Sequence, residues 1–328
     1  MVVKANKGIS TLTAMLGMIS FLIIGLVVGH YMSAFMQGEN GASYPQEFEE
    51  DVAWRTSGIT ISGSTTVLPI ANACAIAFMN KYPHLDRLKI TVQGGGTGVG
   101  YSQVIDGVVD IGMASREPKT TEIENARNKG VDLWLHPIAL DAVIVVVHPS
   151  VANSSYPLSL TLQEVGKIFA GMYTYWDEVK PGLPHKEIEV FVREPGSGTR
   201  GTFEEYTMHP WKYNVTARAK VRGSNPDVKR SVENTLYSIG YVSFGFVSEN
   251  MHVVAIAKEA GKPYVYPTIS SIAKGEYPIS RYLYLVTRGQ PRSGTLSDRF
   301  IDFVRSREGQ QIVEAHGFLK LPYFYYTP

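Results

Sequence analysis

The chain has 328 residues, a formal net charge of +1, 44% hydrophobic residues and 19% charged residues. This length suits two folded lobes, and a near-zero charge without runs of Lys or Arg gives no basis for nucleic-acid binding. Cys74 is the only cysteine, which excludes an intrachain disulfide and a Cys-rich zinc site. We expect Cys74 to be a small buried residue of a helix.

The N-terminal segment is apolar, because residues 8–38 contain no Asp, Glu, Lys or Arg. It is long enough to cross a bilayer once, and Lys4 and Lys7 before it place the N-terminus in the cytoplasm. We therefore predict a cytoplasmic tip and single-pass anchor over residues 1–36, with the rest of the chain outside the cytoplasm. The competing outcome is a cleaved signal peptide and a secreted or periplasmic protein, although "MSAF" at 32–35 is a weak cleavage site.

Residues 37–56 carry five acidic residues against Arg55, a net charge of −4, and are interpreted as an acidic linker. Beyond it, short apolar runs alternate with helical patterns, which predicts an α/β fold. The expected strands are 59–62, 88–93, 110–115, 142–149, 187–193 and 281–287. The expected helices are 67–83, 101–108, 120–130, 159–171 and one long terminal helix over 295–317.

Four of the strand-to-helix turns share hydroxyl-rich and glycine-rich chemistry. They are "SGSTTVLP" at 62–69, "QGGGTGVGYS" at 93–102, "GMASREP" at 112–118 and "VREPGSGTR" at 192–200. Ligands of open α/β sheets sit outside the carboxyl ends of strands, where helix N-termini aim unpaired N–H groups at one place. Each Ser or Thr could singly be a plain helix cap, but their coincidence with two arginines indicates a dehydrated tetrahedral oxyanion. The candidate ligands from these turns are Ser64, Thr65, Thr66, Thr97, Gly98, Ser115, Arg116, Arg193, Ser197, Gly198 and Thr199.

Other chemistries lack their motifs. The stretch 95–102 resembles an NTPase phosphate loop, but Tyr101 stands where that loop needs its lysine. No G-x-S-x-G nucleophile elbow and no H-E-x-x-H metal motif occurs. We therefore expect no enzyme activity, no metal and no cofactor.

Seven motifs in chain order carry a family resemblance: "ISGSTTVLPI", "GGGTGVG", "DIGMASRE", "IFAGMYTYWDEV", "VREPGSGTRGTF", "SIGYVSF" and "YPISRYLYLVT". Together they closely resemble the substrate-binding proteins of phosphate ABC transporters, over roughly residues 57–325. The resemblance implies a two-lobed periplasmic-binding-protein fold of type II, with phosphate clamped between lobes that close by a hinge. It also implies delivery of phosphate to permease and ATPase subunits of an importer, by a protein that need act only as a monomer.

The expected lobes are 57–142 plus 284–328 for lobe 1 and 143–283 for lobe 2. The family's binding residues correspond to Thr65 and Thr66, to Thr97, and to the complete signature Arg193, Ser197, Gly198 and Thr199.

One position departs from the best-known branch of the family, which has an aspartate where this chain has Arg116. That carboxylate accepts a hydrogen bond from protonated phosphate, which separates phosphate from sulfate. We expect Asp141, a lone acid between apolar segments, either to substitute for it or to be a plain structural cap. Two other functions remain as alternatives: a receptor for another oxyanion such as sulfate, molybdate or tungstate, and a membrane-tethered phosphate sensor or enzyme on the same scaffold.

Overall fold

The structure is a computed structural model that describes residues 54–85 and 87–322. The expected membrane anchor and residues 37–53 of the expected linker lie outside this range. Within the described residues no helix is both long and apolar enough to cross a bilayer. A short 3₁₀ turn, η1 (Trp54–Thr56), opens the described chain, and Trp54 packs edge-on against Phe78 and Tyr82.

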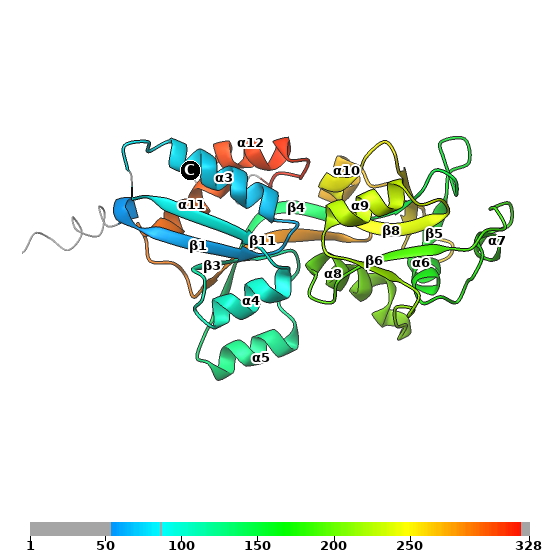
Figure 1. Cartoon of the computed structure of the whole chain (residues 1–328), viewed down its shortest axis with the longest axis horizontal. Coiled ribbons are helices and arrows are strands. Elements are labelled where there is room, and N and C mark those ends of the chain that lie inside the picture. Colours follow the sequence, from blue (N-terminus) through cyan, green and yellow to red (C-terminus); the bar gives the residue numbers. More distant parts are fainter. Residues whose placement is uncertain (1–53, 86, 323–328) are drawn as a thin grey trace, which may run out of the picture. The chain divides into compact units, whose positions relative to one another are not determined.

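The first lobe is an α/β layer built on the strand order β2-β1-β3-β11-β4. β1 pairs in parallel with β2 and β3, and β11 runs antiparallel to β3. Helices α3, α11 and α12 cover one face of this sheet and α4 and α5 lie on the other (Figure 1). The elements are β1 (Gly58–Gly63), α3 (Leu68–Asn80), β2 (Lys89–Gly94), α4 (Thr97–Ile105), β3 (Ile111–Ala114), α5 (Thr120–Asn128), β4 (Leu133–Val147), β11 (Ser280–Arg288), α11 (Leu296–Arg305) and α12 (Arg307–Ala315).

The second lobe continues the path as β4-β8-β6-β7, with β9 beside β4 and a separate parallel pair β5-β10. Figure 1 shows α9 and α10 on one face of this sheet and α8 on the other. The elements are β5 (Ser159–Thr161), α6 (Leu162–Phe169), α7 (Trp176–Val179), β6 (Glu189–Arg193), α8 (Gly198–Thr207), η2 (His209–Trp211), β7 (Lys220–Arg222), α9 (Asn225–Glu233), β8 (Ser238–Ser243), η3 (Phe244–Phe246), β9 (His252–Val253), β10 (Ala255–Ala257) and α10 (Ile269–Ala273).

Strand β4 belongs to both lobes. Its first part, Leu133–Ala142, pairs antiparallel with β11, and from Val143 onward it pairs with β8. Each lobe has its own apolar core. The core of the second lobe consists of residues between 140 and 319, many of them in β4, β6 and β8. The lobe boundaries expected at 142/143 and 283/284 stay a prediction; β4 changes partner at the first, and the second falls inside β11.

The single long helix predicted over 295–317 is wrong, because the structure has two helices there, α11 and α12. Ser306 separates them in an extended conformation (φ −67°, ψ 168°), and its hydroxyl accepts a hydrogen bond from the Gly309 N–H to cap α12. A Cβ at Gly309 would lie 2.2 Å from the Phe303 carbonyl oxygen, so α12 can fold back closely only at a glycine. Residues 305–311 (RSREGQQ) contain no apolar side chain, so a gap in the apolar pattern marks the break that the single-helix prediction overlooked.

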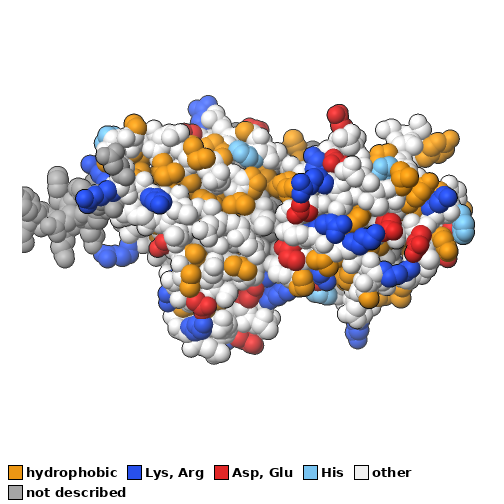
Figure 2. Space-filling model, viewed as in Figure 1, with side chains coloured by type: hydrophobic (Ala, Val, Ile, Leu, Met, Phe, Trp, Pro, Cys, Tyr) orange, Lys and Arg blue, Asp and Glu red, His pale blue; other side chains and the backbone are white. Residues whose placement is uncertain are grey.

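Cys74 lies fully buried in α3, and burial raises the pKa of its thiol to about 12. It is therefore protonated and inert at neutral pH. On the face of the molecule shown in Figure 2, acidic and basic side chains lie interspersed, in keeping with the net charge near zero.

Candidate functional site

The N-terminus of α8 presents a hydroxyl-rich turn directly after β6. Arg193 ends β6, and Ser197 caps α8 by accepting a hydrogen bond from the Arg200 N–H at 3.2 Å. The extended conformation of Ser197 (φ −69°, ψ 130°) lets the chain turn into the helix, whose first residues are Gly198 and Thr199. This end of α8 therefore directs free N–H groups and the positive end of the helix dipole toward the first lobe.

Two turns of the first lobe face this helix. After β1, the backbone turns at Gly63 (φ +137°), and the Ser64 hydroxyl accepts hydrogen bonds from the backbone N–H groups of Thr66 and Val67. Ser64 is thus used as a local cap, and the hydroxyls of Thr65 and Thr66 reach residues of the second lobe. After β2, Thr97 opens α4, and its hydroxyl accepts from the Ser115 N–H at 3.1 Å.

The predicted residues of the two lobes contact one another directly. An Arg193 Nη2–H donates to Thr65 Oγ1 at 2.9 Å, and Thr66 Oγ1 lies 3.0 Å from Thr199 Oγ1. The Gly98 N–H donates to the carbonyl oxygen of Gly196, in the loop before α8, at 3.2 Å. All four predicted turns therefore meet at one place between the lobes.

Gly198 lies at a close approach between the two lobes. A Cβ at this position would lie 2.2 Å from Ser115 Oγ and 2.3 Å from Thr97 Oγ1. Those two hydroxyls are 3.2 Å apart and both belong to the first lobe. Only a residue without a side chain lets the α8 N-terminus come this close.

Arg193 is a buried cation of the site, with its side chain 1% exposed. Its Nε and Nη2 donate to the two carboxylate oxygens of Glu194 at 2.9 and 2.8 Å. Its Nη1 is buried and finds no hydrogen-bond acceptor among the residues that the structure describes. A guanidinium nitrogen is a strong donor, and leaving it unpaired in the interior is costly.

Arg116 and Asp141, the other charged residues that we expected here, are engaged with neighbours. Arg116 donates through Nη1 and Nη2 to the two oxygens of Glu122 at 2.7 and 2.8 Å, and its Nε has no partner within the described chain. Asp141, whose side chain is 0% exposed, accepts from Arg281 at 2.7 and 2.9 Å and from the Phe244 N–H at 3.1 Å.

Sequence reasoning missed Arg281, Asn225 and Ser243. Arg281 lies in β11 opposite Asp141 in the register with β4, and Asn225 and Ser243 join it to Thr66. Burial lowers the pKa of the Arg281 guanidinium from its ordinary value; Asp141 opposes this effect and nearby Arg193 adds to it. The signal was present in the sequence, because a lone arginine inside the apolar strand "YPISRYLYLVT" needs a buried acid.

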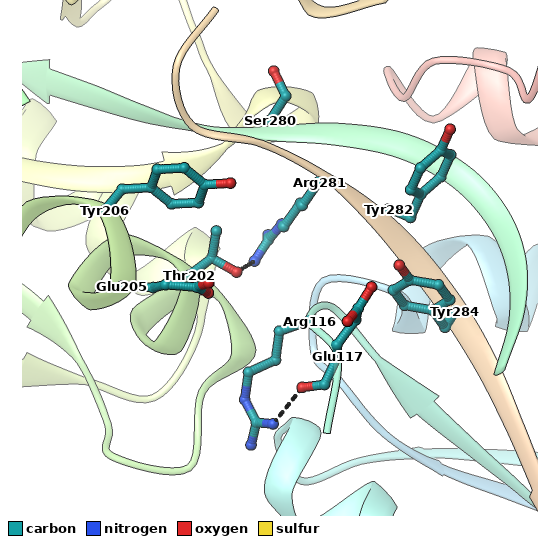
Figure 3. A pocket seen from close by; sticks show the side chains of 9 residues that line it. All are labelled: Arg116, Glu117, Thr202, Glu205, Tyr206, Ser280, Arg281, Tyr282 and Tyr284. Carbon is teal, nitrogen blue, oxygen red and sulfur yellow. Dashed lines mark hydrogen bonds between the residues drawn. The ribbon is translucent and has the colours of Figure 1, made fainter. Parts of the chain in front are cut away.

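A cavity of about 280 Å³ lies beside Arg281 and is lined by residues of β11 and α8 (Figure 3). Arg281 reaches toward Thr202 at one wall, and Tyr206 lies across from it. Burial, with Glu205 and Glu117 nearby, raises the pKa of Tyr206. The lining residues are Arg116, Glu117, Thr202, Glu205, Tyr206, Ser280, Arg281, Tyr282 and Tyr284.

Across residues 54–85 and 87–322, no group of three His, Cys, Asp or Glu side chains is arranged to hold a metal ion. The arrangement instead offers hydroxyls, helix N-termini and a buried guanidinium to an anion. The two-lobed α/β fold and this interlobe site define a ligand-binding protein of the periplasmic-binding-protein class.

Comparison with known proteins agrees with that class. Residues 46–308 match the model of the PBP superfamily domain. The chain is 30% identical to the phosphate-binding protein PstS of Staphylococcus saprophyticus over 81% of each chain. It is 28% identical to PstS of Bacillus subtilis over 96% of this chain and 94% of the relative. This chain therefore belongs to the PBP superfamily and, within it, to the family of the phosphate-binding proteins named PstS.

Solved structures lead to the same family. One is a putative phosphate ABC transporter substrate-binding protein from Clostridium perfringens with bound phosphate, at 30% identity and a TM-score of 0.68, covering 81% of this chain and all of that one. Another is an ABC-type phosphate transport receptor from Vibrio cholerae, at 28% identity and a TM-score of 0.64, covering 80% of this chain and all of that one. The predicted two-lobed α/β fold is thereby confirmed.

Proposed function

We propose that this protein is an extracytoplasmic receptor that binds inorganic phosphate between its lobes and delivers it to the permease and ATPase subunits of an ABC importer. The observation that carries the proposal is the buried Arg193 Nη1, which has no acceptor among the described residues. It lies in a site made of hydroxyls and two helix N-termini, and a tetrahedral oxyanion supplies the acceptors that these donors require. The names of the PstS relatives and the phosphate-bound Clostridium structure support phosphate as the anion.

Several site residues have distinct proposed roles. Arg193 supplies the buried countercharge through Nη1, and the α8 N-terminus supplies the N–H groups of Gly198 and Thr199. Thr65 and Thr97 supply hydroxyls from the first lobe. Each charge-assisted hydrogen bond contributes about 1.5–3 kcal/mol net, so several together hold a desolvated dianion.

The remaining candidates support these ligands. Ser197 and Ser64 cap their own helix and turn, Ser115 holds the Thr97 hydroxyl, and Gly98 contributes an N–H to the interlobe contact. Arg116, held by Glu122, adds positive charge at the edge of the site. These two roles, of direct ligand and of support, stay a proposal for every residue named.

Selectivity for phosphate requires an acceptor for the phosphate proton, and Asp141 is the proposed acceptor. Each carboxylate oxygen has about two acceptor positions, and Asp141 Oδ1 receives only the Phe244 N–H among the described groups. Sulfate has no proton to donate at neutral pH, so an acceptor-only oxygen beside the site disfavours it.

Lobe closure is the proposed capture mechanism. The direct contacts of Thr66 with Thr199 and of Arg193 with Thr65 join the two lobes across the site, and β4 and β11 connect the lobes behind it. An anion that contacts both lobes stabilises the closed arrangement by its differential affinity for that state.

The proposed location is the outer face of the cell membrane. The apolar residues 8–38, with lysines before them, are proposed to anchor a monomeric receptor outside the cytoplasm. If the segment is cleaved, the same receptor would be secreted or periplasmic. Neither catalysis nor nucleic-acid binding belongs to the proposal.

The test is calorimetric titration of the full chain in detergent with phosphate, sulfate, molybdate and tungstate at neutral pH. One-to-one binding of phosphate with little response to sulfate is expected. A preference for another oxyanion would leave the proposed mechanism intact but change the ligand. Arg116, which stands where the best-known branch has its aspartate, favours that outcome. Binding of none of the four would refute the receptor and the phosphate sensor, and would leave the membrane-tethered enzyme as the alternative.

A further inference from the structure

We infer that Arg281 is a positioning residue that fixes the hydroxyl of Thr199 as a hydrogen-bond donor toward the bound anion. The inference rests on the proposed function, since it concerns the same interlobe site. It adds a residue of strand β11 that contributes to affinity without contacting the anion.

Arg281 is held in place from several sides. Its side chain is 5% exposed, and its Nε and Nη2 both donate to Asp141 Oδ2, at 2.9 and 2.7 Å. Nη2 also lies 2.6 Å from Ser243 Oγ and 3.0 Å from Thr199 Oγ1. Nη2 has two hydrogens and three acceptors, so these hydrogens are shared among the Asp141 carboxylate, the Ser243 hydroxyl and the Thr199 hydroxyl.

The chemistry of arginine sets the direction of these bonds. A guanidinium has only donors, so Ser243 and Thr199 must both accept from Arg281. The Ser243 hydrogen is then free to point at Thr66 Oγ1, 3.4 Å away. Thr66 Oγ1 also accepts from Asn225 Nδ2 at 2.9 Å. The Asn225 side chain is oriented by its Oδ1, which accepts from the Ser243 N–H at 3.3 Å.

The orientation of the Thr66 hydroxyl then determines that of the Thr199 hydroxyl. With both acceptor positions of Thr66 Oγ1 occupied, Thr66 donates its own hydrogen to Thr199 Oγ1, 3.0 Å away. Thr199 accepts from Thr66 and from Arg281, and no acceptor among the described residues takes its hydrogen. That hydrogen, at the N-terminus of α8, is the donor available to the anion.

A neutral or differently shaped side chain at position 281 would no longer fix the orientation of the Thr199 hydroxyl. Glutamine could accept as well as donate, so the Thr199 hydroxyl could turn its hydrogen back to residue 281. Lysine keeps the charge beside Asp141 but lacks the planar fork that reaches Ser243 and Thr199 together.

The experiment is a double-mutant cycle on phosphate affinity, with the full chain in detergent. Arg281→Gln and Thr199→Val are measured singly and together by calorimetry, with Arg281→Lys as a second series that keeps the charge if Arg281→Gln fails to fold. Each single variant is expected to weaken phosphate binding about tenfold or more. The double variant is expected to be hardly weaker than Thr199→Val alone, because Arg281 acts through that hydroxyl.

Arg299→Gln is the matched control. Its guanidinium lies 4.9 Å from the Trp54 ring in the first lobe, and its substitution is expected to leave phosphate affinity unchanged.

Four outcomes decide the matter. Non-additive losses support the inference, since a residue that only stabilises the fold would cause the same loss with or without the Thr199 hydroxyl. Wild-type affinity in Arg281→Lys and Arg281→Gln, or losses that multiply in the double variant, overturn it while the receptor function stands. Absence of oxyanion binding by the unmodified chain overturns both the function and the inference.

Discussion

Replacing Gly198 by alanine separates lobe closure from folding. The added methyl would lie 2.2 Å from Ser115 Oγ and 2.3 Å from Thr97 Oγ1, whereas ordinary contacts begin at 3.4 Å, so the lobes must move apart by about 1 Å locally. Both obstructing hydroxyls belong to the opposite lobe. The methyl therefore opposes only the closed state, and we expect the free energy of unfolding of the open protein to change little.

The expected size follows from the cost of overpacking, which is about 1–3 kcal/mol for an added methyl group in a well-packed site. If this cost applies to closure alone, the dissociation constant for phosphate rises about 5- to 150-fold. Calorimetry gives that constant. Thermal unfolding without phosphate gives the stability of the protein itself, and the increase in melting temperature on adding phosphate should shrink in the variant.

Gly196→Ala is the control in the same loop. Nothing lies within 4 Å of a Cβ at Gly196, and its φ is outside the left-handed region, so this alanine is expected to bind phosphate normally. The reasoning is refuted if Gly198→Ala retains wild-type affinity, or if it lowers the melting temperature of the phosphate-free protein as much as it weakens binding.

Four further predictions concern affinity, selectivity, pH and location. Arg193→Ala should weaken phosphate binding about a hundredfold or more, because it removes the buried countercharge; wild-type affinity by calorimetry would contradict that role. Asp141→Asn should bind sulfate appreciably better relative to phosphate in competition titrations, and an unchanged ratio would remove Asp141 from the site. Burial lowers the pKa of His136 to about 4 from 6.5, so the stability it gives is present above pH 6.5 and lost as the pH falls toward 4; melting temperatures of His136→Leu should fall less over that window than those of the wild type. Deletion of residues 1–36 should release the protein from the membrane fraction, and equal retention would argue against the anchor.

The turns of the site could be predicted from the sequence because their chemistry is local. A strand, a glycine-containing turn and a capped helix are encoded within about ten residues, as in the segment from Arg193 to Thr199. The fold class followed from the same alternation of strands and helices, together with the family motifs.

The features that we could not predict from the sequence depend mainly on contacts between segments that are distant in the chain. Arg281 and Asp141 are 140 positions apart, and only the pairing of β4 with β11 shows that they meet. The pairing of Arg116 with Glu122 is close in sequence but depends on how α5 folds back. The early start of β4 at Leu133 was also missed, because His136 and Pro137 interrupt its apolar pattern.

The sharing of β4 between the lobes has a consequence for how the chain folds as it is made. The strands β4, β6, β7 and β8 of the second lobe are all present in the chain by Ser243. The sheet of the first lobe needs β11, which lies between β3 and β4 and comes much later in the chain: Arg281 pairs with Asp141 of β4, 140 positions earlier, and Tyr284 pairs with Ala114 of β3, 170 positions earlier. Until then β3 and the first part of β4 present unpaired edges, and such edges invite aggregation. The segment from Leu133 to Ala142 thus keeps an unpaired edge until β11 is present, and a chain truncated before β11 should gain a folded second lobe without a first.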